Sequence, residues 1–250
     1  MTAKKSNRIE IIDALRGIII VIMILFHLLY DIEAIFGIQF QIMQPDITRI
    51  ILAIFPTCFF IISGVCTAFS RSILKRGLTL FIIGNLITLV TILIIPEQKI
   101  IFGAISSIGC CMLLFCLVKN ILDKIPCLVS VAIFFFLFVA FYEFWYSHSI
   151  NLIFTRVHFD FIVTNNHLYA FGLPHKDLFS ADYFPLLPYF FSFIVGTALS
   201  KPIKQKKFPQ WFYTSKMPII NKIGKYSLVI YIVHQPLIYF TLTMINKFKG

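Results

Sequence analysis

The chain has 250 residues, of which 59% are hydrophobic and only 13% are charged. A water-soluble core of this size cannot bury so much apolar surface, so the composition excludes a soluble globular protein and favours an integral membrane protein. The formal net charge of +11 would also suit a nucleic-acid-binding protein. That class is excluded because the basic residues share no amphipathic face and accompany no aromatic recognition motif.

Hydrophobic runs divide the chain into candidate membrane spans. A helix needs about 20 apolar residues to cross the bilayer. Seven runs of this kind occur, at residues 10–35, 47–69, 75–95, 100–121, 127–147, 183–200 and 219–246. We therefore predict an all-α fold, a polytopic bundle of about seven transmembrane helices that forms one transmembrane domain over residues 1–250. The basic N-terminus resembles a signal peptide, but no small-residue cleavage site follows it, and we expect a retained first span.

The distribution of basic residues predicts which ends of the spans face the cytoplasm. With a cytoplasmic N-terminus, fifteen Lys and Arg residues fall inside and six outside, as the positive-inside rule requires. The inner set is Lys4, Lys5, Arg8, Arg71, Lys75, Arg76, Lys119, Lys124, Lys201, Lys204, Lys206, Lys207, Lys216, Lys222 and Lys225. The outer set is Arg49, Lys99, Arg156, Lys176, Lys247 and Lys249. We thus expect a multi-pass protein of the inner (plasma) membrane, with an extracytoplasmic loop at 148–182 and a basic cytoplasmic linker at 201–218 that is attracted to anionic lipid.

Ionisable residues of the first span share one face of the helix. A charged group inside the bilayer costs roughly 3 kcal/mol or more, which makes such residues candidates for function. At about 100° per residue, four of them fall within a stripe about 60° wide, and we expect this face to meet protein or a water-filled cavity. The four are Asp13, Arg16, His27 and Asp31.

The stripe contains two pairs. Asp13 and Arg16 can pair directly near the cytoplasmic end, either as an interfacial ion pair that fixes the depth of the helix or as part of a binding site. His27 and Asp31 have the spacing of a second pair nearer the outer end. A histidine beside a carboxylate can take up and return a proton, which suits a general base. The alternative is a buried histidine that is hydrogen-bonded across helices.

The last span carries a second polar stripe. Its members lie within about 80° of one another, with Gln235 just beside them. They are Ser227, Tyr231, His234 and Thr241. Pro236 has no backbone N–H, so the carbonyl near Ile232 loses its partner and a kink beside His234 is expected. A kink that serves packing alone is the other interpretation.

Other chemical motifs give no support for further site classes. Four loop histidines, His148, His158, His167 and His175, lack the spacing of zinc ligands, and the six cysteines form no paired CxxC pattern. We expect no metal. No GxSxG, Walker loop, GxGxxG or HExxH sequence occurs.

Segments along most of the chain carry a family resemblance. The chain opens with D-x-x-R-G…F-H-x-x-Y-D within 8–32 and closes with S-L-x-I-Y-x-x-H-Q-P within 223–239, with further similar segments at 59–71, 74–91, 100–109 and 180–199. In this order they resemble the heparan-α-glucosaminide N-acetyltransferase catalytic-domain family, a bacterial membrane family of the transmembrane acyltransferase superfamily. The resemblance implies a transmembrane acetyltransferase that takes acetyl from cytosolic acetyl-CoA, its donor substrate, and passes it to an acceptor across the membrane. Ser106 stands where members of the family often carry histidine.

Together, the stripes and the resemblance predict a site between the first and last spans. We expect His27, oriented by Asp31, to deprotonate a sugar hydroxyl or amine, and His234, Tyr231 or Ser227 to donate to the developing oxyanion. The residues expected to be catalytic are His27, Asp31 and His234. Those expected to bind substrate or donor are Asp13, Arg16, Arg76, Ser106, Ser227, Tyr231 and Gln235. A covalent acetyl-histidine would use the same residues.

The expected partners are membrane lipid, acetyl-CoA, and an envelope glycan or other small acceptor; no nucleic acid is expected, and a homo-oligomer is possible. Two other functions stay open at this point. A proton-coupled transporter or exporter of a small metabolite would use the same polar stripes as a proton relay. A structural assembly partner would need none of their chemistry.

Overall fold

The structure is a computed structural model that describes residues 9–152, 155–159, 166–173 and 178–249. The predictions for Lys4, Lys5, Arg8, His175 and Lys176 lie outside these residues, as does the side chain of His167.

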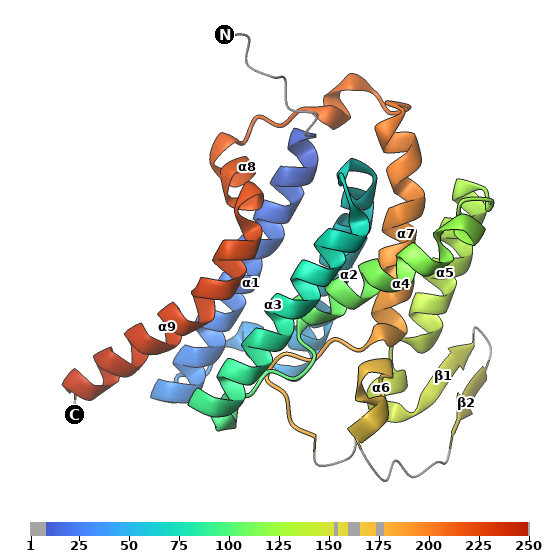
Figure 1. Cartoon of the computed structure of the whole chain (residues 1–250). Helices are drawn as coiled ribbons and strands as arrows, with labels where there is room; N and C mark the ends of the chain where they lie inside the picture. The colour runs from blue at the N-terminus through green and yellow to red at the C-terminus, as the bar shows by residue number, and fades with distance from the viewer. Residues whose placement is uncertain (1–8, 153–154, 160–165, 174–177, 250) are drawn as a thin grey trace. The chain divides into compact units, whose positions relative to one another are not determined.

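Within the described ranges, seven helices are long and apolar enough to cross a membrane, which confirms the all-α membrane fold (Figure 1). They are α1 (Glu10–Phe36), α2 (Pro45–Val65), α3 (Ile73–Ile94), α4 (Ala104–Leu122), α5 (Cys127–Phe141), α7 (Leu186–Lys204) and α9 (Ser227–Lys249). The second span continues into the 3-10 turn η2 (Cys66–Phe69), and the fifth continues through α6 (Phe144–Ser147).

The last predicted span, 219–246, is wrong at its start. The chain forms a separate short helix, α8 (Pro218–Lys225), and α9 begins only at Ser227. Tyr226 lies between the two helices and separates them, because its φ of −101° and ψ of 16° are not helical. Lys222 and Lys225 place charge in the last turn of α8, where cations interact favourably with the helix dipole and oppose entry into the hydrocarbon.

Contacts between residues divide the chain into two compact units, one of residues 1–62 with 206–250 and one of residues 63–205. The first unit contains α1, the turn η1 (Gln41–Met43), α2 as far as Ile62, the turn η5 (Gln210–Tyr213), α8 and α9. In this unit α8 and α9 both pack against α1, although they come from the other end of the chain (Figure 1).

Two glycines allow α8 to lie backbone to backbone against α1. A Cβ at Gly224 of α8 would overlap the carbonyl oxygen of Asp13, and a Cβ at Gly17 of α1 would overlap that of Ile220. Small residues of this kind let membrane helices approach closely. The segment before α8 is also tied to α1, because the backbone N–H of Ser215 donates to Glu10 Oε2 at 3.1 Å. These contacts set where α9 starts beside α1.

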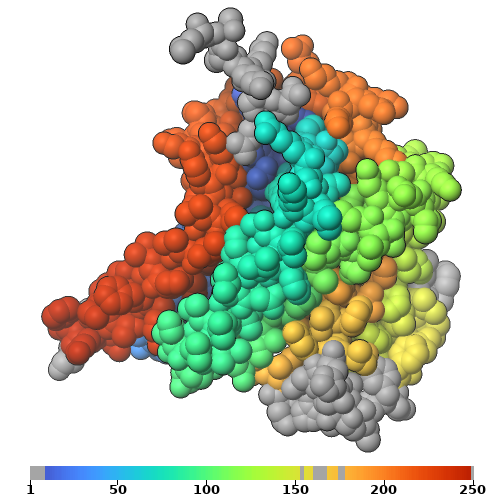
Figure 2. Space-filling view, in the orientation of Figure 1, coloured from blue at the N-terminus to red at the C-terminus, as the bar shows by residue number. Residues whose placement is uncertain are grey.

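The outward surface of α8 and α9 forms one continuous band on the face drawn in Figure 2. Along α9, Val229, Leu237 and Phe240 are exposed, whereas His234 on the same helix is buried. Apolar side chains on one side and a buried polar group on the other are what a helix between lipid and protein requires.

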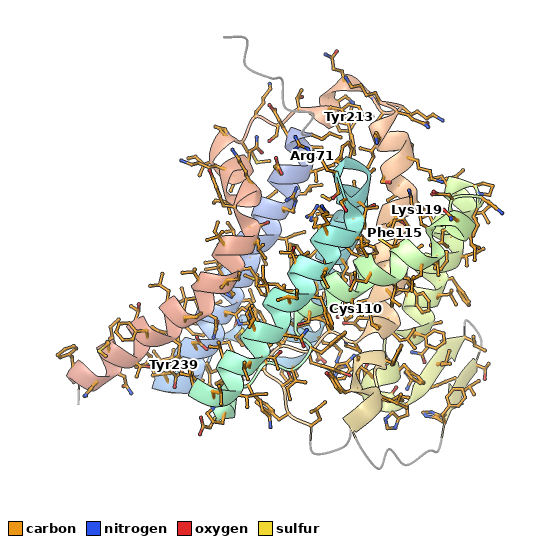
Figure 3. All side chains as sticks on the ribbon, in the orientation of Figure 1. Arg71, Cys110, Phe115, Lys119, Tyr213 and Tyr239 are labelled. Carbon is orange, nitrogen blue, oxygen red and sulfur yellow. The ribbon has the colours of Figure 1, made fainter. Side chains whose placement is uncertain are left out.

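The second unit is built on the antiparallel pair α3 and α4 and on the pair α5 and α7. Gly84 of α3 packs on Ser106 of α4, and Gly77 packs on Met112 about two helical turns further along. Phe115, labelled in Figure 3, joins α4 to α7 through an edge contact with Phe193 at 6.2 Å between ring centroids.

The polar segment after α6 forms a short antiparallel hairpin of β1 (Ser149–Leu152) and β2 (Thr155–His158), in which Ser149 faces His158, and then the turn η4 (Asn166–Phe171). Further along, the chain pairs with the connection between α3 and α4. Ser180 Oγ accepts from Ile101 N at 2.8 Å, and Asp182 Oδ2 accepts from Ala104 N, the first residue of α4, at 3.1 Å. The carboxylate therefore caps this helix.

Basic residues gather at one end of the second unit. Because α3 and α4 are antiparallel, Arg71 before α3 and Lys119 near the end of α4 lie at the same end (Figure 3). Lys201 of α7 joins them through an ion pair with Asp123 at 3.1 Å. Three helices thus place residues that were assigned to the cytoplasm together, although the orientation of the whole chain stays a prediction.

Candidate functional site between α1 and α9

The polar stripes of α1 and α9 meet at two histidines. The rings of His27 and His234 are 5.2 Å apart between centroids and tilted by 53°. Phe26 and Tyr231 flank them, at 5.9 Å from His27 and 5.7 Å from His234. His234 is only 8% exposed, whereas His27 is half-buried.

Asp31 and Gln235 form a hydrogen bond across the same two helices. Gln235 Nε2 donates to Asp31 Oδ2 at 3.0 Å, and Asp31 is only 6% exposed. In the part of the chain that the structure describes, the carboxylate is bonded to Gln235 and not to His27. This differs from the expected His27–Asp31 pair, since a spacing of four residues permits a contact on one helix but does not compete with a well-placed amide donor on the facing helix.

The contact of His234 with its own helix indicates its tautomer. Its Nδ1 lies 2.6 Å from the backbone carbonyl oxygen of Tyr231. A carbonyl oxygen only accepts, so Nδ1 carries the proton, and in the neutral ring the lone pair is on Nε2. His234 in this form takes up a proton at Nε2 and does not donate one from it. Of the three groups expected to donate to the oxyanion, His234 can therefore donate from Nε2 only when its ring is protonated, whereas the hydroxyls of Tyr231 and Ser227 can donate as they are.

The second pair of the stripe lies further towards the start of α1. Arg16 donates to Asp13 Oδ1 at 2.9 Å, with side chains 16% and 10% exposed. Eleven residues separate Arg16 from His27, which corresponds to roughly 16 Å along a helix. Arg16 Nε is buried and has no hydrogen-bond partner among the described residues, which leaves one donor of the guanidinium for another acceptor.

The remaining predicted residues of α9 differ in their surroundings. Ser227 is buried at the start of the helix, and Tyr231 is half-buried. Thr241 is exposed and bonds to Leu237 O of its own helix at 2.7 Å, so it does not extend the site. The helix continues through Pro236.

Arg76 and Ser106 belong to the second unit. Ser106 is 2% exposed in the first turn of α4, and its Cα would lie 2.7 Å from a Cβ at Gly84. The absence of a side chain at Gly84 thus lets α3 approach Ser106 closely. The expected role of Ser106 in donor binding stays a prediction, as does that of Arg76. Sequence reasoning missed the structural role of Gly17 and Gly224. Their only signal was a small residue in each of two segments that have no other obvious reason to meet.

Within the described residues, no group of three or more His, Cys, Asp and Glu side chains is placed to hold a metal ion.

A comparison with protein families decides the relationship of the chain. The family model described as Heparan-alpha-glucosaminide N-acetyltransferase, catalytic, matches residues 8–236. The chain belongs to this family. The match includes α1 and extends through Pro236 in α9, so it spans every residue of the α1–α9 site. This member of the N-acetyltransferase family is thus a multi-pass membrane protein. Neither the curated proteins nor the solved structures that were compared contain a match to it.

Proposed function

We propose that this family member is a transmembrane acetyltransferase of the inner membrane that moves acetyl from cytosolic acetyl-CoA to an extracytoplasmic acceptor. The observation that carries the proposal is the contact between His27 and His234 at 5.2 Å within one unit of the fold. The family description names a glucosaminide as the acceptor of the related enzymes. An amino sugar is accordingly the first acceptor to test here, with a sugar hydroxyl as the alternative.

Two polar positions of α1, Arg16 and His27, suit the two ends of acetyl-CoA. The anionic nucleotide end would be held by Arg16 through charge-assisted hydrogen bonds. The pantetheine arm would then follow α1, and the thioester would arrive at the histidine pair. The roughly 16 Å between Arg16 and His27 along the helix leaves room for an extended pantetheine arm between these two residues.

The reaction itself requires one proton transfer. The acceptor nitrogen or oxygen attacks the thioester carbonyl carbon, the new C–N or C–O bond forms, and the C–S bond breaks. One histidine of the pair takes the acceptor proton and returns it to the CoA thiolate. The hydroxyl of Tyr231 or Ser227 would donate to the oxyanion of the tetrahedral intermediate. An acetyl-histidine intermediate uses the same two rings and differs only in the order of steps.

Radiolabelled acetyl-CoA tests the proposal with the purified full-length protein in lipid nanodiscs. Methyl α-D-glucosaminide serves as the amine acceptor and methyl α-D-glucoside as the hydroxyl acceptor. We expect label in the sugar, and a loss of transfer of about 100-fold or more in His27→Ala and in His234→Ala, the size typical of a lost general base. His158→Ala changes an exposed histidine of β2 and is the matched control.

Two results would overturn the proposal: label that never leaves CoA for either sugar, or normal transfer in both histidine variants. Proton-coupled uptake of a small metabolite by vesicles that lack acetyl-CoA would instead favour a transporter that uses the same stripes.

A further inference from the structure

Gln235 is held at one end of its amide and left with an open acceptor at the other. Its Nε2 donates to Asp31 Oδ2 at 3.0 Å. Its Oε1 is buried and has no hydrogen-bond partner among the residues that the structure describes. A buried acceptor without a donor is costly in a protein, and more so away from water, so an atom of this kind calls for a partner that arrives from outside.

The charge of Asp31 decides which end of the amide is open. An ionised carboxylate only accepts hydrogen bonds, so it holds the NH₂ end of Gln235 and turns the oxygen away. A charge-assisted bond of this kind also restricts rotation of the amide. Gln235 therefore presents an oxygen of fixed direction, and whatever binds it has to donate an N–H or O–H.

The residues of this hydrogen bond are neighbours of the two histidines along α1 and α9. Gln235 directly follows His234 in α9, and Asp31 lies one helical turn after His27 in α1. The hydrogen bond and the ring contact thus join the same two helices at neighbouring levels. The thioester carbonyl of the donor has no hydrogen to give, whereas the acceptor of the acetyl group does.

We propose that Gln235 binds the nucleophilic group of the acceptor, and that Asp31 is the positioning residue that orients Gln235. The assignment rests on the proposed acetyltransferase function. It gives Asp31 a role different from the one expected from sequence, in which it oriented His27.

The arrangement makes Gln235 a specificity-determining residue. A primary amine has two hydrogens, so one is donated to Gln235 Oε1 while the other points to a histidine. When the nitrogen attacks the thioester carbon, the second hydrogen passes to the histidine and then to the departing thiolate, and the first stays on the nitrogen, bonded to Gln235, in the amide product. A hydroxyl has one hydrogen and cannot serve both groups at once. Gln235 thus favours transfer to an amine over transfer to a hydroxyl.

The test measures kcat/KM for methyl α-D-glucosaminide and for methyl α-D-glucoside, two acceptors that differ in one group. Gln235→Met keeps the size of the side chain and removes the amide. We expect its kcat/KM for the amine to fall roughly tenfold, the effect of one hydrogen bond, while that for the hydroxyl changes by less than about threefold. The thermal stabilisation of the protein by acetyl-CoA should stay as in wild type. Gln98→Met, at an exposed position of the α3–α4 connection, is the matched control.

A reciprocal exchange separates positioning from folding. Asp31→Asn and Gln235→Glu each disturb the pair, the second by placing two carboxylates together. When both changes are combined, the amide introduced on α1 can donate to one oxygen of the carboxylate introduced on α9 and leave the other oxygen as the acceptor. We expect this double variant to recover the preference for the amine to within about threefold of wild type, beyond the sum of the single changes.

The two levels of the proposal fail in different ways. Transfer by wild type together with an unchanged ratio of amine to hydroxyl in Gln235→Met would overturn the role of Gln235 and leave the acetyltransferase intact. A double variant no better than the single ones would overturn the positioning role of Asp31. Absence of transfer to either sugar by wild type would overturn the function and, with it, the assignment.

Discussion

The carbonyl oxygen of Asp13 on α1 occupies the space that a Cβ on Gly224 of α8 would need. The backbones of two helices from opposite ends of the chain are therefore in direct contact at this point. Asp13 also accepts the hydrogen bond of Arg16. The contact thus places the helix that precedes the last span beside the Asp13–Arg16 pair of α1.

Gly224→Ala should separate α8 from α1. The added methyl group meets backbone rather than a flexible side chain, so we expect a loss of stability of about 1–3 kcal/mol, as for other overpacked sites. Thermal unfolding in detergent, followed by tryptophan fluorescence, measures it. Lys222→Ala on the exposed side of the same helix should shift stability by no more than about 0.5 kcal/mol. Equal effects of the two changes would contradict the close approach.

Ser106→His should be poorly tolerated. Ser106 is 2% exposed and packs on Gly84 of α3, so an imidazole should overpack this contact, and we expect a destabilisation of about 1–3 kcal/mol. Ser106→Ala keeps the small size and should unfold within about 1 kcal/mol of wild type. A change in acetyl-CoA-dependent stabilisation in Ser106→Ala, with folding intact, would show that the hydroxyl binds donor in addition to packing.

Arg16→Met should destabilise the protein by on the order of 3 kcal/mol, because it removes the guanidinium that pairs with the buried carboxylate of Asp13. Adding Asp13→Asn removes the carboxylate charge as well and should restore much of the folding. If Arg16 also binds the nucleotide of acetyl-CoA, the refolded double variant still lacks stabilisation by acetyl-CoA, since a ligand raises stability only in proportion to its affinity. Normal stabilisation in that variant would assign the pair to helix placement alone.

Tyr183 gives the stability a dependence on high pH. Its hydroxyl donates to Tyr169 O at 2.5 Å, and burial raises the pKa of Tyr183 above its usual value. A raised pKa means that, as the pH rises, the unfolded chain loses the phenolic proton of Tyr183 before the folded chain does. The contribution of Tyr183 to the free energy of unfolding is therefore complete below about pH 10 and declines as the pH rises above it. The melting temperature measured from pH 8 to 11 should fall less steeply in Tyr183→Phe than in wild type. Parallel curves would contradict this expectation.

Cysteine labelling tests the predicted orientation. In a background without the six native cysteines, Leu168→Cys in η4 and Lys216→Cys before α8 each add one thiol at an exposed position. A membrane-impermeant maleimide added to intact cells should label position 168 and not 216. The reverse pattern would place the N-terminus outside and overturn the proposed direction of transfer.

The sequence predicted most of the spans because their apolar runs match the thickness of a bilayer, a property of each segment alone. The Asp13–Arg16 pair follows from helix periodicity in the same way. What it did not predict depends on which helices meet. Lys222 and Lys225 sit in an otherwise apolar run, and only the observed break at Tyr226 separates α8 from α9. Likewise, Asp31 is close to His27 in sequence and far from Gln235. Helix periodicity predicts contacts within one helix, and it does not predict that a residue on another helix is the partner.

The bond between Asp31 and Gln235 joins residues 204 positions apart in the chain. During synthesis at the ribosome, α1 is complete long before α9 exists. For that interval, its buried carboxylate and its histidine have no α9 to meet, and a polar face is exposed to lipid or to the insertion machinery. Assembly of the first unit therefore waits for the last helix to be made. Chains that are truncated before α9 keep that polar face uncovered.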